Sequence, residues 1–183
     1  MTPEQREIDR VIHQTVQACE TMSRERTGVL IVFERATLLT EYMKSGTVLD
    51  AQVSSELLRN LFFTKAALHD GAVIIRKERI AAAGCVLPLT QNRNISSDLG
   101  TRHRAAIGIS EASDAVVVIV SEETGTISVA INGMLKRYLA PQTLEKLLLK
   151  ELAPKEPETS KNPLKRICKP RSRKGKDDTN AKT

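Results

Sequence analysis

Two short polar clusters interrupt apolar sequence and carry side chains that can do chemistry. The first, residues 68–72 (Leu-His-Asp-Gly-Ala), contains a carboxylate at Asp70 and an imidazole at His69. The second, residues 100–104 (Gly-Thr-Arg-His-Arg), contains two guanidinium groups and a further imidazole, His103. A carboxylate can bind a divalent metal or accept a hydroxyl proton, and guanidinium groups bind phosphate. An acidic, metal-binding group opposite a cationic, phosphate-binding group is the pairing that nucleotidyl transfer requires.

The first cluster has two interpretations. In the chemical one, Asp70 is a catalytic residue and metal ligand and His69 is a second ligand, because carboxylate and imidazole groups both bind divalent cations. Gly71, which has no Cβ, lets a ligand approach the backbone where an apolar strand begins at Ala72. In the other interpretation Asp70 and Gly71 form an ordinary turn, since Asp-Gly is a common turn pair.

The second cluster is predicted to open a helix, with Gly100 before it and Thr101 at its start. A helix N-terminus offers free N–H groups and a partial positive charge to an anion. Arg102 and Arg104 oppose the helix dipole there, at a cost of about 0.3 to 1 kcal/mol each, and a bound phosphate relieves the conflict. The cluster, including His103, is therefore predicted to bind phosphate. The alternative is an exposed basic turn that Thr101 caps.

A third polar group, Ser121-Glu122-Glu123, ends an apolar strand. Side chains at strand ends often face a cleft at the edge of a sheet, so Glu122 and Glu123 are candidate Mg²⁺ or Mn²⁺ ligands and Ser121 is a candidate phosphate contact. Adjacent glutamates at a hairpin also form solvated turns, and that alternative stays open. The sequence contains no Walker P-loop, no GxGxxG fingerprint and no zinc-ligand spacing.

The spacing of apolar residues predicts the elements that hold these clusters. Residues 3–26 have apolar positions at helical spacing, and Gly28 is expected to end that helix. Further helices are expected over residues 38–43, 54–63, 101–110 and 141–152, and strands over residues 28–34, 72–75, 79–87, 116–121 and 126–131. Helices and strands are mixed and several strands form hairpins. This order is typical of a single α/β domain with a mixed parallel and antiparallel central sheet flanked by helices.

The positive charge of the chain is concentrated at its C-terminus. Residues 153–183 hold ten Lys and Arg against four Asp and Glu, whereas residues 1–152 hold eighteen of each. We therefore expect one folded domain over 1–152 and a disordered basic tail over 153–183. The tail is either a solubilising terminus or a weak contact for RNA or an anionic membrane. The neutral domain and an aromatic content of 3% argue against nucleic acid as its partner.

Cysteine usage and hydropathy indicate the compartment. Cys19, Cys85 and Cys168 are isolated and form no CxxC pair, which favours buried thiols in a reducing compartment. The sequence has no signal peptide and no run of the roughly 18 apolar residues that a membrane helix needs. The sequence as it stands therefore predicts a cytoplasmic polypeptide.

At these clusters the sequence resembles the diadenylate cyclase domain family, whose hallmarks are a DGA motif and an RHR motif, here residues 70–72 and 102–104. The similarity covers about residues 5–152 and includes the segment 120–125. It is greatest to the membrane-anchored type, in which transmembrane helices precede a helix similar to residues 3–26. The resemblance implies that the full-length protein sits at the cytoplasmic face of the cell membrane.

The resemblance implies that two ATP molecules condense into cyclic di-AMP with release of two pyrophosphates. The implied catalytic residues are Asp70, Arg102 and Arg104, with Asp70 acting on the 3′-hydroxyl directly or through Mn²⁺ or Mg²⁺. The residues implied to bind ATP are Gly71, Ala72, Leu87, Gly100, Thr101, Arg102, His103, Arg104 and Ser121, and the implied metal ligands are His69, Asp70, Glu122 and Glu123. Several relatives have a tyrosine beside the adenine where this chain has Val86. Leu87 is still expected to read the base through its backbone.

The cyclic product has two equivalent phosphodiester bonds, and one cleft has room for one ATP. The cyclase resemblance therefore implies a homodimer whose two chains meet face to face. Two other classes of function stay open. One is a catalytically silent nucleotide-binding sensor, although Asp70 argues for chemistry because simple binding needs cations but no acid at the hydroxyl. The other is RNA binding through the tail, against which the neutral domain counts.

Overall fold

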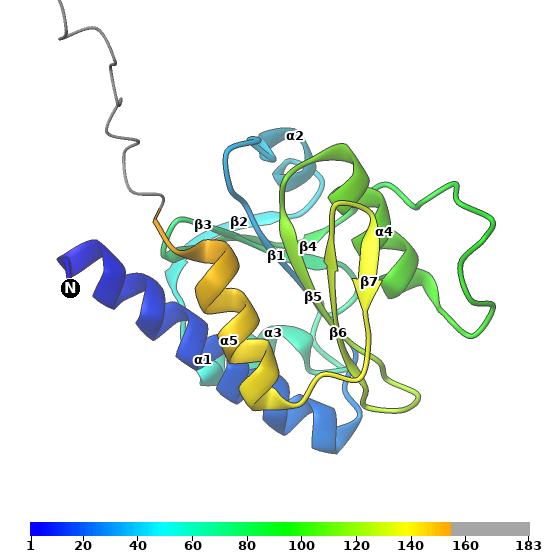
Figure 1. Cartoon of the computed structure of the whole chain (residues 1–183), viewed down its shortest axis with the longest axis horizontal. Helices are drawn as coiled ribbons and strands as arrows, with labels where there is room; N and C mark the ends of the chain where they lie inside the picture. Colours follow the sequence, from blue (N-terminus) through cyan, green and yellow to red (C-terminus); the bar gives the residue numbers. More distant parts are fainter. Residues whose placement is uncertain (155–183) are drawn as a thin grey trace, which may run out of the picture.

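The computed structural model describes residues 1–154 and contains one seven-stranded sheet with the order β2-β4-β3-β1-β5-β6-β7 (Figure 1). The strands are β1 (Val29–Phe33), β2 (Thr47–Gln52), β3 (Ala72–Arg76), β4 (Arg79–Cys85), β5 (Val116–Val120), β6 (Ile127–Ile131) and β7 (Met134–Lys136). The helices are α1 (Pro3–Glu25), α2 (Thr40–Met43), α3 (Ser55–Phe62), α4 (Thr101–Ala112) and α5 (Pro141–Leu152).

The sheet is mixed, as the sequence predicts. The central strand β1 pairs in parallel with β3 and antiparallel with β5, and all other pairs are antiparallel. The register aligns Val29 with Val120 and Ala72 with Cys85. The starts of β1 and β3 and the ends of β4 and β5 therefore lie side by side where these strands begin or end. We call this side of the sheet the polar edge, as distinct from the edge strands β2 and β7. The polar cluster at residues 68–72 lies at the start of β3, and the group at residues 121–123 follows the end of β5. The cluster at residues 100–104 lies at the start of α4.

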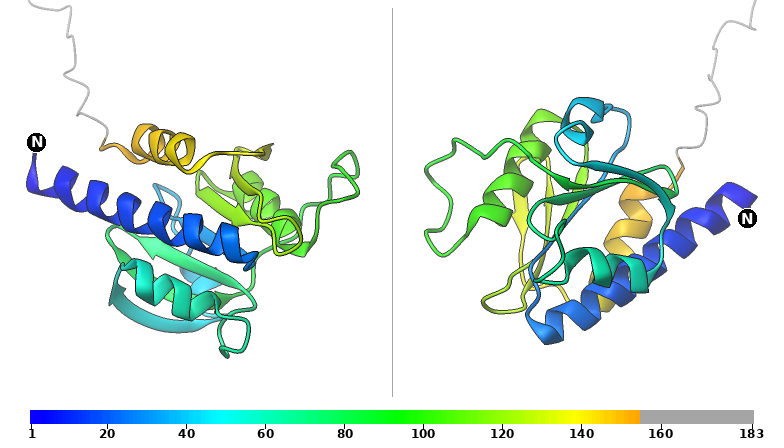
Figure 2. Two further views of the ribbon diagram at one scale, coloured as in Figure 1. Left: turned by 90° about the horizontal axis from the view of Figure 1, so that it is seen from below. Right: turned by 180° about the vertical axis from the view of Figure 1, so that it is seen from behind.

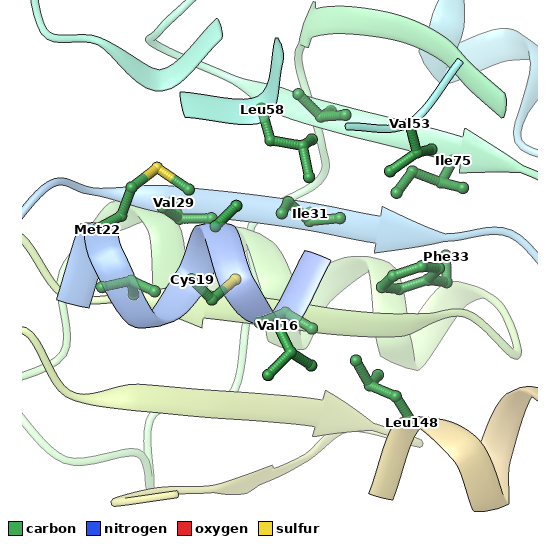
Figure 3. Close-up of a cluster of buried hydrophobic side chains, with 14 of the residues drawn as sticks. Val16, Cys19, Met22, Val29, Ile31, Phe33, Val53, Leu58, Ile75 and Leu148 are labelled. Atoms are coloured by element: carbon green, nitrogen blue, oxygen red, sulfur yellow. The ribbon is translucent and has the colours of Figure 1, made fainter. Parts of the chain in front are cut away.

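Helices cover both faces of the sheet and make a three-layer α/β domain (Figure 2). Along β1 the side chains alternate, so that Val29, Ile31 and Phe33 pack with α1, α3 and α5, whereas Leu30 and Val32 pack with α2 and α4. Figure 3 shows the first of these cores, in which α1 lies across β1. The helix α4, which carries the RHR motif, is thus held against the second face of β1 and β5.

The helix α1 begins as the sequence predicts but ends differently. Pro3 is in its first turn, and the Thr2 side chain accepts a hydrogen bond from the Gln5 N–H at 3.1 Å. Its C-cap is Arg26, which takes the left-handed conformation with φ of 53°. The expectation that Gly28 ends the helix is therefore wrong. Gly28 instead leaves space that the guanidinium group of Arg102 occupies.

Two strands that the sequence analysis does not predict complete the sheet at its edges. β2 has a largely exposed pattern and an irregular register between Val48 and Ala51, where Asp50 has φ of 49°. β7 has only three residues, Met134–Lys136. Neither carries the alternating or continuous apolar pattern on which strand prediction depends. The remaining predicted elements are confirmed to within a few residues at their ends.

The predicted boundary between domain and tail remains a prediction, because residues 155–183 lie outside the described part of the chain. Within residues 1–154, no helix combines the length and apolar character needed to cross a bilayer. Cys19 and Cys85 are buried free thiols, as the sequence predicts, and burial raises their pKa values to about 12 and about 11.

Candidate active site

A pocket of about 530 Å³ opens at the polar edge, between the strand ends and the N-terminus of α4. Its volume is within the range of small-molecule sites. The residues that line it are Leu30, Asp70, Gly71, Cys85, Val86, Leu87, Leu89, Asp98, Gly100, Thr101, Arg102, His103, Ala105, Val120, Ser121, Glu122 and Glu123. The two polar clusters and the Ser-Glu-Glu group, which are far apart in the sequence, thus meet in one cavity.

Three of the candidate residues do not line this pocket: His69, Ala72 and Arg104. Ala72 is fully buried in β3, and its side chain belongs to the core. Arg104 is two residues after Arg102 on α4, which turns it about 200° around the helix axis to the opposite side. Its backbone carbonyl accepts a hydrogen bond from Thr90 N–H at 3.0 Å. A phosphate role for Arg104 stays a prediction that the pocket of one chain does not support.

Arg102 is the guanidinium group in the pocket, and its position depends on Gly28. A Cβ at Gly28 would lie 2.4 Å from Arg102 Cζ, so the absence of a side chain there makes room for the guanidinium. Arg102 Nη1 lies 3.3 Å from Glu122 Oε2, and its Nε is buried without a hydrogen-bond partner among the described residues. An unpaired buried donor at a pocket wall is suited to an anionic ligand.

The N-terminus of α4 is arranged to receive an anion. The N-cap Gly100 makes no side-chain hydrogen bond to the first turn, and a Cβ built there would meet no atom within 4 Å. The first-turn N–H groups therefore have no side-chain cap, and the space beside them is open. His103 in that turn is 7% exposed, and burial, followed by the Arg137 charge, lowers its pKa below 6.5, whereas Asp98 raises it. Burial therefore favours the neutral form of the imidazole.

Gly71 has a role in strand packing that the sequence analysis does not predict. Its φ is +141°, and a Cβ there would lie 2.7 Å from the backbone carbon of Gly84 in β4. The absence of a side chain thus lets β3 and β4 come together beside Asp70. Gly71 also lines the pocket, so close approach of a ligand to its backbone stays a prediction.

The geometry of His69 suits a metal ligand even though it lies outside the pocket lining. Its Nδ1 is 2.8 Å from the Ala66 carbonyl oxygen, so Nδ1 carries the proton and Nε2 keeps a free lone pair. Asp70, the next residue, is exposed at the pocket wall. Within residues 1–154, however, no group of three or more His, Cys, Asp or Glu side chains converges into a preformed metal site. The four predicted ligands therefore do not form a closed cage.

The segment Ser121-Glu122-Glu123 is a turn and also lines the pocket, so the metal-ligand and turn interpretations are compatible. The Ser121 Oγ accepts hydrogen bonds from the N–H groups of Glu123 and Thr124 at 3.2 and 3.3 Å, so the segment is a turn. Its hydroxyl proton stays available to a ligand. Glu122 and Glu123 are exposed, as in a solvated turn, but they also line the pocket.

The loop of residues 86–100 forms the remaining wall of the pocket and bears on which ligand binds there. Leu87 is 7% exposed and lines the pocket, whereas Val86 is 69% exposed at its rim. Gly108 lets this loop cross α4 closely, because a Cβ there would lie 1.9 Å from the Pro88 carbonyl oxygen. Asp98, which is not among the candidate residues of the sequence analysis, is a further pocket residue. Nothing in its local sequence distinguishes it, because its partner, Arg137, is 39 residues away.

Comparison with known proteins identifies relatives of this architecture. A family model described as DisA bacterial checkpoint controller nucleotide-binding, abbreviated DAC, matches residues 16–135. The chain is 46% identical over 161 residues to the cyclic di-AMP synthase CdaA of Bacillus subtilis, covering 88% of this chain and 59% of that protein. It is 45% identical over 148 residues to a diadenylate cyclase of Listeria monocytogenes, covering 81% of this chain and 54% of that protein. The chain thus spans less than two thirds of the length of these curated relatives.

Solved structures show the same fold. The crystal structure of a Staphylococcus aureus DacA double mutant matches with a TM-score of 0.78 and 47% identity, covering 79% of this chain and 97% of that one. A hypothetical membrane-spanning protein from Bacillus cereus matches with a TM-score of 0.68 and 42% identity, covering 70% of this chain and 63% of that one. The sequence match over residues 16–135 and the shared fold show that the chain belongs to the diadenylate cyclase (DAC) domain family.

Proposed function

We propose that this chain is a diadenylate cyclase, a nucleotidyltransferase that condenses two ATP molecules into cyclic di-AMP and releases two pyrophosphates. The observation that carries the proposal is that Asp70 and Arg102 face one pocket, with Thr101 and Ser121 beside them. The names of the relatives, cyclic di-AMP synthase and diadenylate cyclase, support the same activity.

The pocket has an apolar part that suits a purine and a polar part that suits phosphates. Leu30, Leu87 and Ala105 lie among its lining residues and provide an apolar surface for adenine. The exposed position of Val86 offers no aromatic ring, so the base is held by shape and by backbone groups near Leu87. The triphosphate then lies toward the N-terminus of α4.

Three groups hold the phosphates in this proposal. The first turn of α4 supplies N–H groups and a partial positive charge. Arg102 adds a charge-assisted hydrogen bond to the α-phosphate or the pyrophosphate, which requires it to leave Glu122. The Ser121 hydroxyl donates to a phosphate oxygen while its own oxygen stays held by the turn. Together they offset the charge that develops on the transferred and leaving groups.

Asp70 acts at the 3′-hydroxyl. The 3′-oxygen of one nucleotide forms a bond to the α-phosphorus of the other, the bond from that phosphorus to the bridging oxygen breaks, and pyrophosphate leaves. The hydroxyl proton passes to the Asp70 carboxylate, which acts as the general base. A second, identical step closes the ring. Positioning the two nucleotides supplies much of the remaining rate enhancement.

A divalent metal, Mg²⁺ or Mn²⁺, fits the donor set. Such ions are usually held by one or two carboxylates together with substrate phosphates and water, so an open set of oxygen donors is sufficient. His69 through Nε2, Asp70 and the Glu122–Glu123 pair would hold the ion. Bound there, it would lower the pKa of the hydroxyl and neutralise phosphate charge.

The proposal includes a face-to-face homodimer, because one pocket accommodates one ATP and the product has two equivalent bonds. The Bacillus cereus neighbour is named a hypothetical membrane-spanning protein, which supports the further proposal that the domain works at the cytoplasmic face of a membrane within a longer protein.

A catalytically silent nucleotide sensor is the competing function. Incubating the chain with ATP and Mn²⁺ or Mg²⁺ and separating the products by mass distinguishes the two, since a sensor leaves ATP unchanged.

A further inference from the structure

Asp98 places a negative charge in the wall of a pocket that is proposed to bind a triphosphate. It lies two residues before Gly100, the N-cap of α4, and it lines the same cavity as Thr101 and Arg102. An unneutralised carboxylate at this position would repel phosphate oxygens. The charge therefore needs a partner if the pocket is to bind ATP.

Arg137 is that partner. Its Nη2 lies 2.8 Å from Asp98 Oδ2 and its Nη1 lies 3.5 Å from Oδ1, a two-pronged arrangement. The pair connects the loop before α4 with the residue that follows the edge strand β7. Ser96 also donates its hydroxyl to the same carboxylate. Arg137 and Ser96 together lower the pKa of Asp98 to about 2, so the carboxylate is charged under all physiological conditions.

The Arg137 side chain is partly buried beside Tyr138. Its Nε is buried without a hydrogen-bond partner among the described residues, and its guanidinium lies 5.0 Å from the centroid of the Tyr138 ring. The Arg137 side chain is 26% exposed, against 55% for Asp98. Neighbouring groups do not replace it, because burial favours the neutral form of His103 and Arg102 is assigned to the phosphates. Arg137 itself does not line the pocket.

We propose that Arg137 is a positioning residue for ATP: it neutralises Asp98 at the phosphate-binding wall. The inference rests on the proposed function and adds a residue outside the pocket on which nucleotide affinity depends. Arg137 acts through Asp98 and not by its own contact with phosphate. The two residues should therefore be strongly coupled in ATP binding.

Five variants test the coupling: Arg137→Gln, Arg137→Lys, Asp98→Asn, the double variant of Arg137→Gln with Asp98→Asn, and Arg79→Gln as a matched control. Arg79 forms a similar ion pair with Asp50, at 2.6 Å, on the β2–β4 side of the sheet and away from the pocket. The measurement is the Kd of a non-hydrolysable ATP analogue by calorimetry, at low and high salt, with a melting curve for each variant.

We expect Arg137→Gln to weaken binding by about tenfold or more at low salt, and by less at high salt because the repulsion is screened. Asp98→Asn should bind at least as well as the parent, because it removes the repelling charge. The double variant should bind within about threefold of the parent, and Arg79→Gln should be unchanged. Arg137→Lys keeps the charge and should retain most of the affinity, which separates loss of neutralisation from loss of folding.

Two results with the variants would overturn the inference. If the double variant binds as weakly as Arg137→Gln, Arg137 acts by its own contact or through the fold. If Arg137→Gln binds normally at low salt, the ion pair is a surface feature without a role in the site. The readout is binding and not turnover, so a parent chain that binds the analogue but makes no cyclic di-AMP contradicts only the proposed function. A parent chain that does not bind it contradicts both.

Discussion

Gly28→Ala should damage the active site without damaging the fold. The new methyl group would lie 2.4, 2.6 and 2.8 Å from Arg102 Cζ, Nη1 and Nε, all far below van der Waals contact. Gly28 has no positive φ, so alanine is compatible with its backbone conformation. The atoms in the way belong to the end of a long flexible side chain, which can move at small cost. The expected result is therefore a displaced guanidinium in an intact domain.

The magnitude follows from the contact that is lost. A hydrogen bond to a charged group contributes about 1.5 to 3 kcal/mol, so kcat/KM for ATP should fall by about 10- to 150-fold. The melting temperature should change by only a few degrees. Gly46→Ala is the contrasting control, because its Cβ would lie 2.3 Å from the Ala83 backbone oxygen, which cannot move aside. That variant should lose stability although it is not a pocket residue.

A double-mutant cycle tests whether Gly28 acts through Arg102. If Gly28 acts only through Arg102, then Gly28→Ala in an Arg102→Ala background should cost nothing further. The assay is the initial rate of cyclic di-AMP formation together with nucleotide binding. An equal loss in both backgrounds, or parent kinetics for Gly28→Ala alone, would refute the argument that this glycine makes room for the phosphate-binding guanidinium.

Four further outcomes are expected. Arg104→Ala should leave the ATP affinity of the isolated chain within about threefold of the parent, because Arg104 is outside the pocket. Arg102→Ala should weaken binding by more, and equal losses for the two variants in calorimetry would contradict this. Burial lowers the folded-state pKa of His103 below 6.5, so the unfolded chain binds the proton more readily and the free energy of unfolding should decrease as pH falls below about 6.5. In denaturant titrations, His103→Gln should reduce this decrease in the free energy of unfolding at low pH. An unchanged decrease would mean that other titrating groups cause it. In dilute solution the initial rate per chain should rise with protein concentration, whereas a constant rate per monomeric chain would exclude the face-to-face dimer. Removal of divalent metal with a chelator should abolish turnover, and its restoration by Mn²⁺ or Mg²⁺ is the check.

The sequence predicted the central part of the fold because that part has the strongest patterns. β1 and β5 are continuous apolar runs buried on both faces, and α1 has a long amphipathic stripe. The edge strands β2 and β7 have exposed positions and are specified by pairing with β4 and β6, which no local pattern records. The mixed sheet was predictable, but its two edges were not.

The site was predictable where chemistry is local and unpredictable where it depends on contacts between distant segments. Asp70 and Arg102 belong to compact motifs and both reach the pocket. The role of Gly28 depends on a side chain 74 positions later, and the role of Asp98 depends on Arg137. Such pairings follow from the topology of the sheet and not from residue spacing. They emerge only when the strand ends are brought to one edge.

The central claim is tested most directly by the products and stoichiometry of the reaction, measured for the parent chain and for Asp70→Asn. Parent protein with ATP and Mn²⁺ or Mg²⁺ should yield cyclic di-AMP and pyrophosphate in a ratio of 1:2, as the balanced condensation requires. Asp70→Asn should melt like the parent and bind ATP within about threefold, since Asp70 is exposed, while product formation falls by about 10² to 10⁴. A parent chain that binds ATP and returns it unchanged, or a folded Asp70→Asn variant that makes cyclic di-AMP at the parent rate, would contradict the account.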